Sequence, residues 1–258
     1  MDQRTLSNTP LERKLGIRLP KIPKLLTYIP YYTCFMLGVY WVIHARLPLE
    51  SPRFDELVLD MGYSKQAWRW WTYMLLHSNL LHIAINSASW VLFAGMIEFD
   101  NKAYRLIPMH FIGVIGGACG VGWESRFVGT YRRVVGASGG IYCLWTCQIG
   151  NMILNWPELN LYRRAAYVWL LVAMMIGDIT STAIRYDPML AYSNHIGGAI
   201  TGVFTGGLLM KNMVKLSWER KYKIISGVLL GIWLISGCTN LLINFTNLEW
   251  SWWCWAMF

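Results

Sequence analysis

Charged residues are scarce in this chain. Aspartate, glutamate, lysine and arginine make up 14% of its 258 residues, whereas 55% of them are hydrophobic. A soluble globular domain usually carries about 25% charged residues, and the mean hydropathy of +0.34 also lies on the apolar side. The shortage of charge argues against a soluble domain and predicts a protein that lies largely in lipid.

Acidic residues are scarcer than basic ones, so the formal net charge is +9. In a soluble protein that balance would favour a nucleic acid partner. Here the basic residues gather beside apolar stretches, in segments 4–24, 163–164 and 211–223, as cytoplasmic loops do under the positive-inside rule. We therefore expect no nucleic acid partner and a basic cytoplasmic segment at residues 1–27.

Cysteine patterns that would hold a metal or build a disulfide framework are missing. None of the six cysteines forms a CxxC pair, and most lie in apolar stretches. Cys143 and Cys147 are one helical turn apart, where a direct disulfide is uncommon. The first apolar stretch also lacks a convincing small-residue cleavage site, so no cleavable signal peptide is expected. The sequence predicts no metal site and no cofactor.

Long apolar stretches, by contrast, are abundant. A hydrocarbon core about 30 Å thick needs roughly 20 residues of helix, and seven stretches approach that length. The fourth and sixth are rich in glycine, which lets helices approach closely in lipid. The sequence therefore predicts an all-α membrane protein, a polytopic helical bundle. The expected spans are 28–45, 74–96, 106–123, 138–155, 165–184, 193–211 and 224–245.

The basic amino-terminal segment sets the expected orientation. With this segment in the cytoplasm, alternation of the spans places loop 46–73 and the carboxyl terminus outside. Loop 46–73 ends in an aromatic run at 68–71, which is typical of a segment in the headgroup layer. Arg132 and Arg133 are an exception to the charge rule, because they also fall outside. The expected inside loops are 97–105, 156–164 and 212–223.

Polar residues within the spans are few, and four of them could form one site. Ser138 lies between glycine-rich neighbours at the start of the fourth span. His82 and Asn86 lie in the second span, and His195 lies near the start of the sixth. Because these three spans all enter the membrane from the outside, we expect the four side chains at similar depth on one side.

The residue types indicate acyl-transfer chemistry. A serine hydroxyl is a weak nucleophile until a neighbouring base takes its proton, and histidine is the natural base near neutral pH. No aspartate accompanies His195 in its segment, which favours a dyad of Ser138 and His195. His82 and Asn86 are spaced i, i+4 and share one helical face. With the Ser138 backbone N–H, they could hold the oxygen of a tetrahedral intermediate.

The remaining polar residues of the spans have structural interpretations. His77 is interpreted as a donor at a helix mouth that tethers the outer loop, and His44 and His110 as structural or interfacial residues. Asp178 fits either a polar network or a proton relay. Asn244 begins a glycosylation sequon, but it lies too close to the expected membrane edge to be modified readily.

In these positions the chain resembles the rhomboid intramembrane serine proteases. The matches follow the family's order across roughly residues 28–211, and their joint occurrence is specific, whereas GxSG alone would be a weak signal. The seventh span resembles the 6+1 arrangement of eukaryotic secretory-pathway members. The matching residues are Trp68 and Arg69 in the first loop, His77, His82 and Asn86 as HxxxxHxxxN, Gly136 and Ser138 in GxSG, and His195, Gly198 and Gly202 as HxxGxxxG.

The resemblance implies a role for each matching residue. Ser138 would be the nucleophile and His195 the general base, with an oxyanion hole made by His82, Asn86 and the Ser138 backbone. Contact between the fourth and sixth helices would depend on Gly198 and Gly202. The supporting residues would be Gly136, His77, Trp68 and Arg69.

The resemblance also implies an organisation and a substrate class. A six-helix protease core would occupy 28–211, and 212–258 would hold a basic loop, the seventh helix and a short aromatic tail. The substrates would be single-pass membrane proteins, cleaved in or next to their transmembrane helix at the outer face. Their ectodomains, which are growth-factor-like for many animal members of the family, would be released in the Golgi, the endoplasmic reticulum or the plasma membrane.

Two other functions stay open from the sequence. A rhomboid-like protein without protease activity could bind membrane clients and control their trafficking or degradation, but such proteins typically lack the serine or the histidine. A small transporter could use Asp178 and the histidines as a proton path, but it would predict internal repeats, and none are visible.

Overall fold

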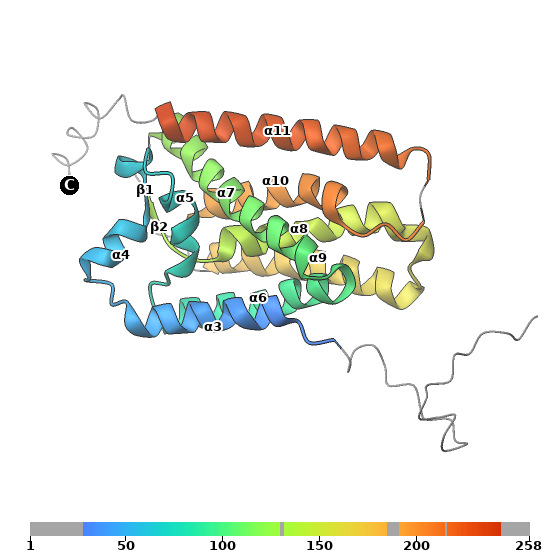
Figure 1. Cartoon of the computed structure of the whole chain (residues 1–258), viewed down its shortest axis with the longest axis horizontal. Helices are drawn as coiled ribbons and strands as arrows, with labels where there is room; N and C mark the ends of the chain where they lie inside the picture. The colour runs from blue at the N-terminus through green and yellow to red at the C-terminus, as the bar shows by residue number, and fades with distance from the viewer. Residues whose placement is uncertain (1–27, 130–131, 185–190, 215, 244–258) are drawn as a thin grey trace, which may run out of the picture.

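The computed structural model describes residues 28–129, 132–184, 191–214 and 216–243. The basic segment 1–27, the sequon at Asn244 and the aromatic tail therefore lie outside the described residues. In the described part, seven long helices form a bundle (Figure 1), which confirms the predicted all-α class. These helices are α3 (Tyr31–Arg46), α6 (Leu80–Asn101), α7 (Ala103–Val128), α8 (Ser138–Asn155), α9 (Leu161–Ile184), α10 (Tyr192–Leu209) and α11 (Glu219–Ile243).

Short elements cover one end of this bundle, at the left of Figure 1. Strands β1 (Leu59–Asp60) and β2 (Arg133–Val134) pair antiparallel, with Leu59 opposite Val134. The other short elements are α4 (Pro52–Leu57), η1 (Met61–Tyr63), α5 (Arg69–Thr72), η2 (Tyr73–Leu75) and, elsewhere in the chain, η3 (Trp156–Glu158). The loop expected at 46–73 is thus a folded cap over the bundle end.

Acidic partners accompany Arg132 and Arg133, the two arginines that the expected topology makes an exception to the charge rule. Arg132 forms an ion pair of 2.8 Å with Glu124 at the end of α7. Arg133 forms ion pairs with Asp55 and with Asp60, the latter at 3.4 Å. Because their charges are locally balanced, these arginines hold the cap to the bundle.

By length and composition, three of the described helices qualify as candidate membrane spans, namely α6, α7 and α11. Helix α6 begins at Leu80, six residues later than the predicted second span. The preceding residues form the turn η2 and an extended stretch, and the Asn79 side chain caps the helix by accepting the His82 N–H at 2.8 Å.

The predicted extent of the loop at 97–105 is wrong. Helix α6 continues to Asn101 and α7 begins at Ala103, so that Lys102, with φ 69°, makes the whole turn. Glu98 does not end the helix, because it is fully buried and accepts the Thr33 N–H at 2.8 Å. Its carboxylate thereby caps the start of α3, where helix N–H groups lack partners.

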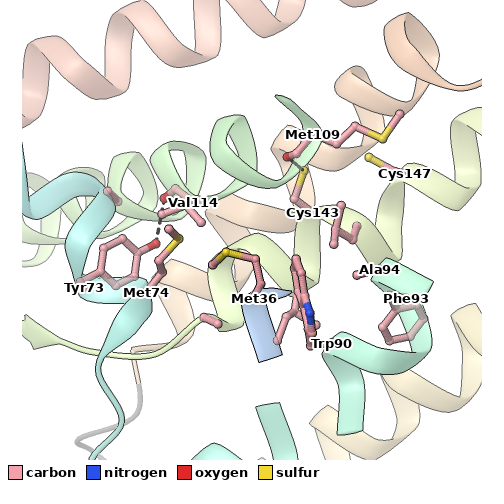
Figure 2. Packing of buried hydrophobic residues seen from close by; sticks show 14 of the residues in the cluster. Met36, Tyr73, Met74, Trp90, Phe93, Ala94, Met109, Val114, Cys143 and Cys147 are labelled. Atoms are coloured by element: carbon pink, nitrogen blue, oxygen red, sulfur yellow. Dashed lines mark hydrogen bonds between the residues drawn. The ribbon is translucent and has the colours of Figure 1, made fainter. Parts of the chain in front are cut away.

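Helices α7, α8 and α10 pack together at the centre of the bundle, with α11 against α7 and α10. A side chain at Gly202 of α10 would collide with the Cys143 carbonyl of α8. Its absence lets the two backbones touch, as small residues do in membrane helices. Around this centre, a buried cluster joins α3, α6, α7 and α8; Figure 2 shows members of it, among them Met36, Trp90, Met109 and Cys143.

Candidate active site

Ser138 is the first residue of α8, directly after a sharp turn of the chain. The turn contains Gly136 at φ 118°, a conformation that favours glycine. The Gly136 N–H is held by the Tyr73 carbonyl at 3.0 Å. A side chain at Gly136 would lie 2.8 Å from Nε2 of His82. The glycine of the GxSG run therefore lets the His82 ring approach the backbone two residues before the serine.

His195 lies in the first turn of α10, with Nε2 at 3.0 Å from the Ser138 hydroxyl oxygen. This distance lies within hydrogen-bonding range. No hydrogen-bond partner of the other ring nitrogen, Nδ1, lies among the residues that the structure describes. Instead, the imidazole stacks on the Tyr142 ring, with centroids 4.2 Å apart and planes 10° apart. The Tyr142 hydroxyl donates to Asp178 of α9 at 2.6 Å. The described geometry is that of a Ser–His pair.

His82 reaches the same end of the bundle from α6. Its Nδ1 lies 3.1 Å from the Ser78 hydroxyl and 3.5 Å from the Ser78 backbone N–H. When the N–H donates to Nδ1, the ring proton resides on Nε2, the nitrogen nearer Gly136. That tautomer presents a hydrogen-bond donor close to the serine.

Asn86 lies one turn deeper in α6 and is buried. Its amide nitrogen donates to the His82 carbonyl at 2.9 Å, and its Oδ1 has no hydrogen-bond partner among the described residues. The amide group retains one further N–H. Asn86 thus belongs to the group around His82 but lies behind it.

A cavity of about 380 Å³ opens at this group. Its lining includes Ser138, His82 and His195, together with Arg133 and Ile85. Asn86 is not part of the lining. The cavity gives the serine hydroxyl a space in which a substrate and a water molecule could approach it.

Two further residues contact this site and were missed in the sequence. Asn194 donates from Nδ2 to the Ser138 hydroxyl oxygen at 3.3 Å, and the Tyr73 hydroxyl donates to Oδ1 of Asn194 at 2.9 Å. Burial raises the pKa of the Tyr73 phenol, so its proton is retained. Tyr73 gave no signal, whereas Asn194 offered one, as an amide beside a histidine at a helix mouth.

The predicted supporting residues stabilise the surroundings of the site. Arg69 is buried and donates to the Val58 carbonyl at 2.8 Å, while exposed Trp68 donates from its indole to the Glu56 carbonyl at 3.1 Å. His77 is buried, with its ring 5.3 Å from the His82 ring. Neither of its ring nitrogens has a hydrogen-bond partner among the described residues, so its predicted role as a donor that tethers the outer loop is wrong. Gly198 lies against the Gly139 backbone, since a side chain there would meet its carbonyl. These residues position the first loop, the His82 ring and the two central helices.

The described part of the chain contains no cluster of side chains that could bind a metal ion. No group of three or more histidine, cysteine, aspartate or glutamate side chains lies close enough there to hold an ion. The chemistry that the described site can perform is nucleophilic attack by a serine assisted by a histidine.

A family model described as the rhomboid domain matches residues 64–212, more than half of the chain. The chain belongs to the rhomboid family. The matched range contains Ser138, His195, His82 and Asn86, and it ends before α11.

Rhomboid relatives from animals and plants resemble this chain at low identity. Rhomboid-related protein 1 of Caenorhabditis elegans is 28% identical over 180 residues, which are 69% of this chain and 49% of the relative. Rhomboid-related protein 3 of Homo sapiens is 25% identical over 179 residues, 64% of this chain and 43% of the relative. RHOMBOID-like protein 5 of Arabidopsis thaliana is 25% identical over 145 residues, 56% of this chain and 45% of the relative. The chain spans about half the length of these relatives. Rhomboid membership and the apolar helices together establish a membrane protein.

Proposed function

We propose that this rhomboid is an intramembrane serine protease that cleaves single-pass membrane proteins. The observation that carries the proposal is the 3.0 Å approach of His195 Nε2 to the Ser138 hydroxyl at the edge of a cavity. A protein that only binds clients has no need for a base at hydrogen-bonding distance from a serine. Rhomboid membership supports the same assignment.

In the proposed acylation step, the Ser138 oxygen attacks the carbonyl carbon of the substrate peptide bond, and its proton moves to His195 Nε2. Negative charge develops on the carbonyl oxygen. Donors on the His82 side of the cavity, with the Ser138 backbone N–H, would stabilise this charge. His195 then gives its proton to the leaving amine, and the acyl-enzyme remains.

Deacylation consumes water, which lipid excludes. A water molecule attacks the acyl carbon and passes a proton to His195, and the ester bond to Ser138 breaks as that proton returns to the serine oxygen. The cavity of about 380 Å³, with its polar lining, supports access of this water. The short elements over the same end of the bundle would shield the site from lipid.

The substrate helix must unwind before its backbone can reach Ser138, because helical carbonyls are already hydrogen-bonded. Residues that form helices poorly lower this cost by up to about 1 kcal/mol each for glycine and about 3 kcal/mol for proline. The proposed substrates are therefore single-pass proteins with glycine, proline or polar residues near the outer membrane face. Cleavage there would release their ectodomains within the secretory pathway.

Co-expression with a panel of such substrates tests the proposal. The wild type should release an ectodomain fragment, whereas Ser138→Ala and His195→Ala should each abolish release while the protein still accumulates in membranes. Because the two residues act as one unit, the double variant should be no worse than either single variant. Ser226→Ala, which alters a buried serine of α11, is the matched control.

Equal fragment release by wild type and Ser138→Ala would refute the protease assignment. Stable association with the uncleaved substrates in that case would identify a client-binding rhomboid instead.

A further inference from the structure

The Ser138 hydroxyl has a second polar neighbour besides His195. Asn194 precedes that histidine in α10, is 1% exposed, and donates from Nδ2 to the serine oxygen at 3.3 Å. The distance is long for an N–H···O bond, as catalytic hydrogen bonds often are before substrate binds. One hydroxyl group therefore contacts both a base and an amide donor.

The orientation of the Asn194 amide follows from its other contact. The Tyr73 hydroxyl lies 2.9 Å from Asn194 Oδ1 and 2.8 Å from the Val114 carbonyl, and it shares its single hydrogen between these two acceptors. Figure 2 shows the Tyr73 hydroxyl directed at the Val114 carbonyl. With Oδ1 turned to the phenol, the NH₂ group of Asn194 faces Ser138.

Two glycines provide the space for this arrangement. A side chain at Gly139 would lie 2.7 Å from Asn194 Oδ1 and 2.8 Å from the Tyr73 hydroxyl. A side chain at Gly117 of α7 would collide with the same two groups. The side chains of Tyr73 and Asn194 thus fill a gap that α7 and α8 leave open beside the nucleophile. Tyr73 and Asn194 are hydrogen-bonded to each other in this gap, so the amide of Asn194 is held in a defined position beside Ser138.

We propose that Asn194 is a catalytic residue that donates a hydrogen bond to the Ser138 oxygen, and that Tyr73 is the positioning residue that orients it. The inference rests on the proposed protease function and extends the Ser–His pair to three groups. A donor on the serine oxygen leaves the hydroxyl proton free to move to His195.

The same donor acts in deacylation. There, water bonds to the acyl carbon and gives a proton to His195, while the bond between that carbon and the serine oxygen breaks. The electron pair of this bond stays on the serine oxygen, which Asn194 stabilises until His195 returns the proton. Loss of the donor is therefore expected to lower kcat more than to change KM.

Substitution of each residue tests its role in cleavage of a substrate by the full-length purified protein. Asn194→Ala should lower kcat by about 10- to 100-fold, the scale of one hydrogen bond to a reacting oxygen. Tyr73→Phe should lower kcat less, and the double variant should be no worse than Asn194→Ala alone. Asn240→Ala, which removes a buried amide from α11, is the control and should match the wild type. A wild-type kcat in Asn194→Ala overturns the proposal.

An isosteric variant separates donation from packing. Asp at this position keeps the shape of Asn194, but only its protonated form can donate to Ser138. The rate of Asn194→Asp divided by the wild-type rate should therefore rise as the pH falls from about 8 to about 5. A ratio that stays constant with pH would assign Asn194 a packing role and overturn the proposal. Thermal unfolding of each variant shows that the comparison is made on folded protein.

A fluorophosphonate probe keeps this inference separate from the proposed function. The probe phosphonylates a reactive serine with loss of fluoride, and the serine proton passes to the base. Labelling should occur in the wild type, be absent in Ser138→Ala and be slowed about 10-fold or more in Asn194→Ala. If labelling follows this order but no substrate is cleaved, only the protease function fails. If labelling of Asn194→Ala equals the wild type, the role of Asn194 fails.

Discussion

At the residue scale, the site differs from a serine hydrolase triad in how its histidine is held. In a triad, a carboxylate bonds to Nδ1 and fixes the ring. Here the imidazole of His195 is stacked on Tyr142, whose hydroxyl is bonded to Asp178. Stacking fixes the plane of the ring, and the bond to Asp178 fixes the stacking partner. Tyr142 of α8 thus orients the His195 ring, in the place of a carboxylate bonded directly to Nδ1.

The donors near His82 carry a prediction at the same scale. His82 lines the cavity and Asn86 lies behind it, bonded to its carbonyl. His82→Ala should therefore lower kcat by about 100- to 1000-fold, and Asn86→Ala by a smaller factor within about 10- to 1000-fold, as for oxyanion donors. Steady-state kinetics of the purified variants measures both, with Ser87→Ala on the same helix as control. Wild-type turnover in Asn86→Ala would remove Asn86 from the mechanism.

Local sequence patterns predicted part of this site. Ser138 and His195 were identifiable because each is a polar residue at a predicted helix mouth, within two residues of a glycine. Tyr73 carried no such signal, and the amide of Asn194 beside His195 could not be connected to it, because their 2.9 Å contact depends on how closely α7, α8 and α10 pack. Contact between distant segments is set by the tertiary fold, on which spacing within one segment gives no information.

At the element scale, the helices follow hydrophobic length, but their ends follow specific hydrogen bonds. Helix α8 occupies Ser138–Asn155, as the predicted fourth span does, because glycine and polar residues mark its ends. The turn at Lys102 was not predicted, because a charged residue such as Glu98 is typical of a loop and the predicted loop therefore included it. The Glu98 carboxylate accepts hydrogen bonds from the first N–H groups of α3. It is a buried helix cap only because α3 packs beside it. Helix ends that depend on a distant partner are therefore the least predictable.

The contact between α8 and α10 carries a prediction about stability. Gly202→Val should destabilise the protein by about 1–3 kcal/mol or more, because the new side chain would collide with the Cys143 carbonyl and separate the helices. Gly231→Val in α11 is the matched control, since nothing lies within 4 Å of a side chain there. Thermal unfolding in detergent measures the difference. An equal melting temperature for both variants would contradict close packing at Gly202.

At the scale of the whole molecule, the starts of α6, α8 and α10 lie at one end of the bundle. His82, Ser138 and His195 meet there, at the end that is covered by the cap with β1 and α5 and by β2, which pairs with β1. The described part of α3 begins at the opposite end, and α11 ends on the side of the cap (Figure 1). The arrangement gives the site one entrance face, so the orientation of the protein in the membrane decides which compartment the site serves.

The last prediction concerns this orientation. The basic residues at 4–24, 163–164 and 211–223 favour the cytoplasm, which places the amino terminus inside and the cap end, with Ser138, outside. Tags at the two ends of the chain, tested by protease protection in sealed vesicles, should show the amino-terminal tag in the cytoplasm and the carboxyl-terminal tag on the opposite side. A cysteine introduced at exposed Trp68 of the cap should then react with an impermeant thiol reagent only from the outside. Two tags on the same side would contradict the seven-helix count. An outside amino terminus would turn the site to the cytoplasm, where it could not release ectodomains.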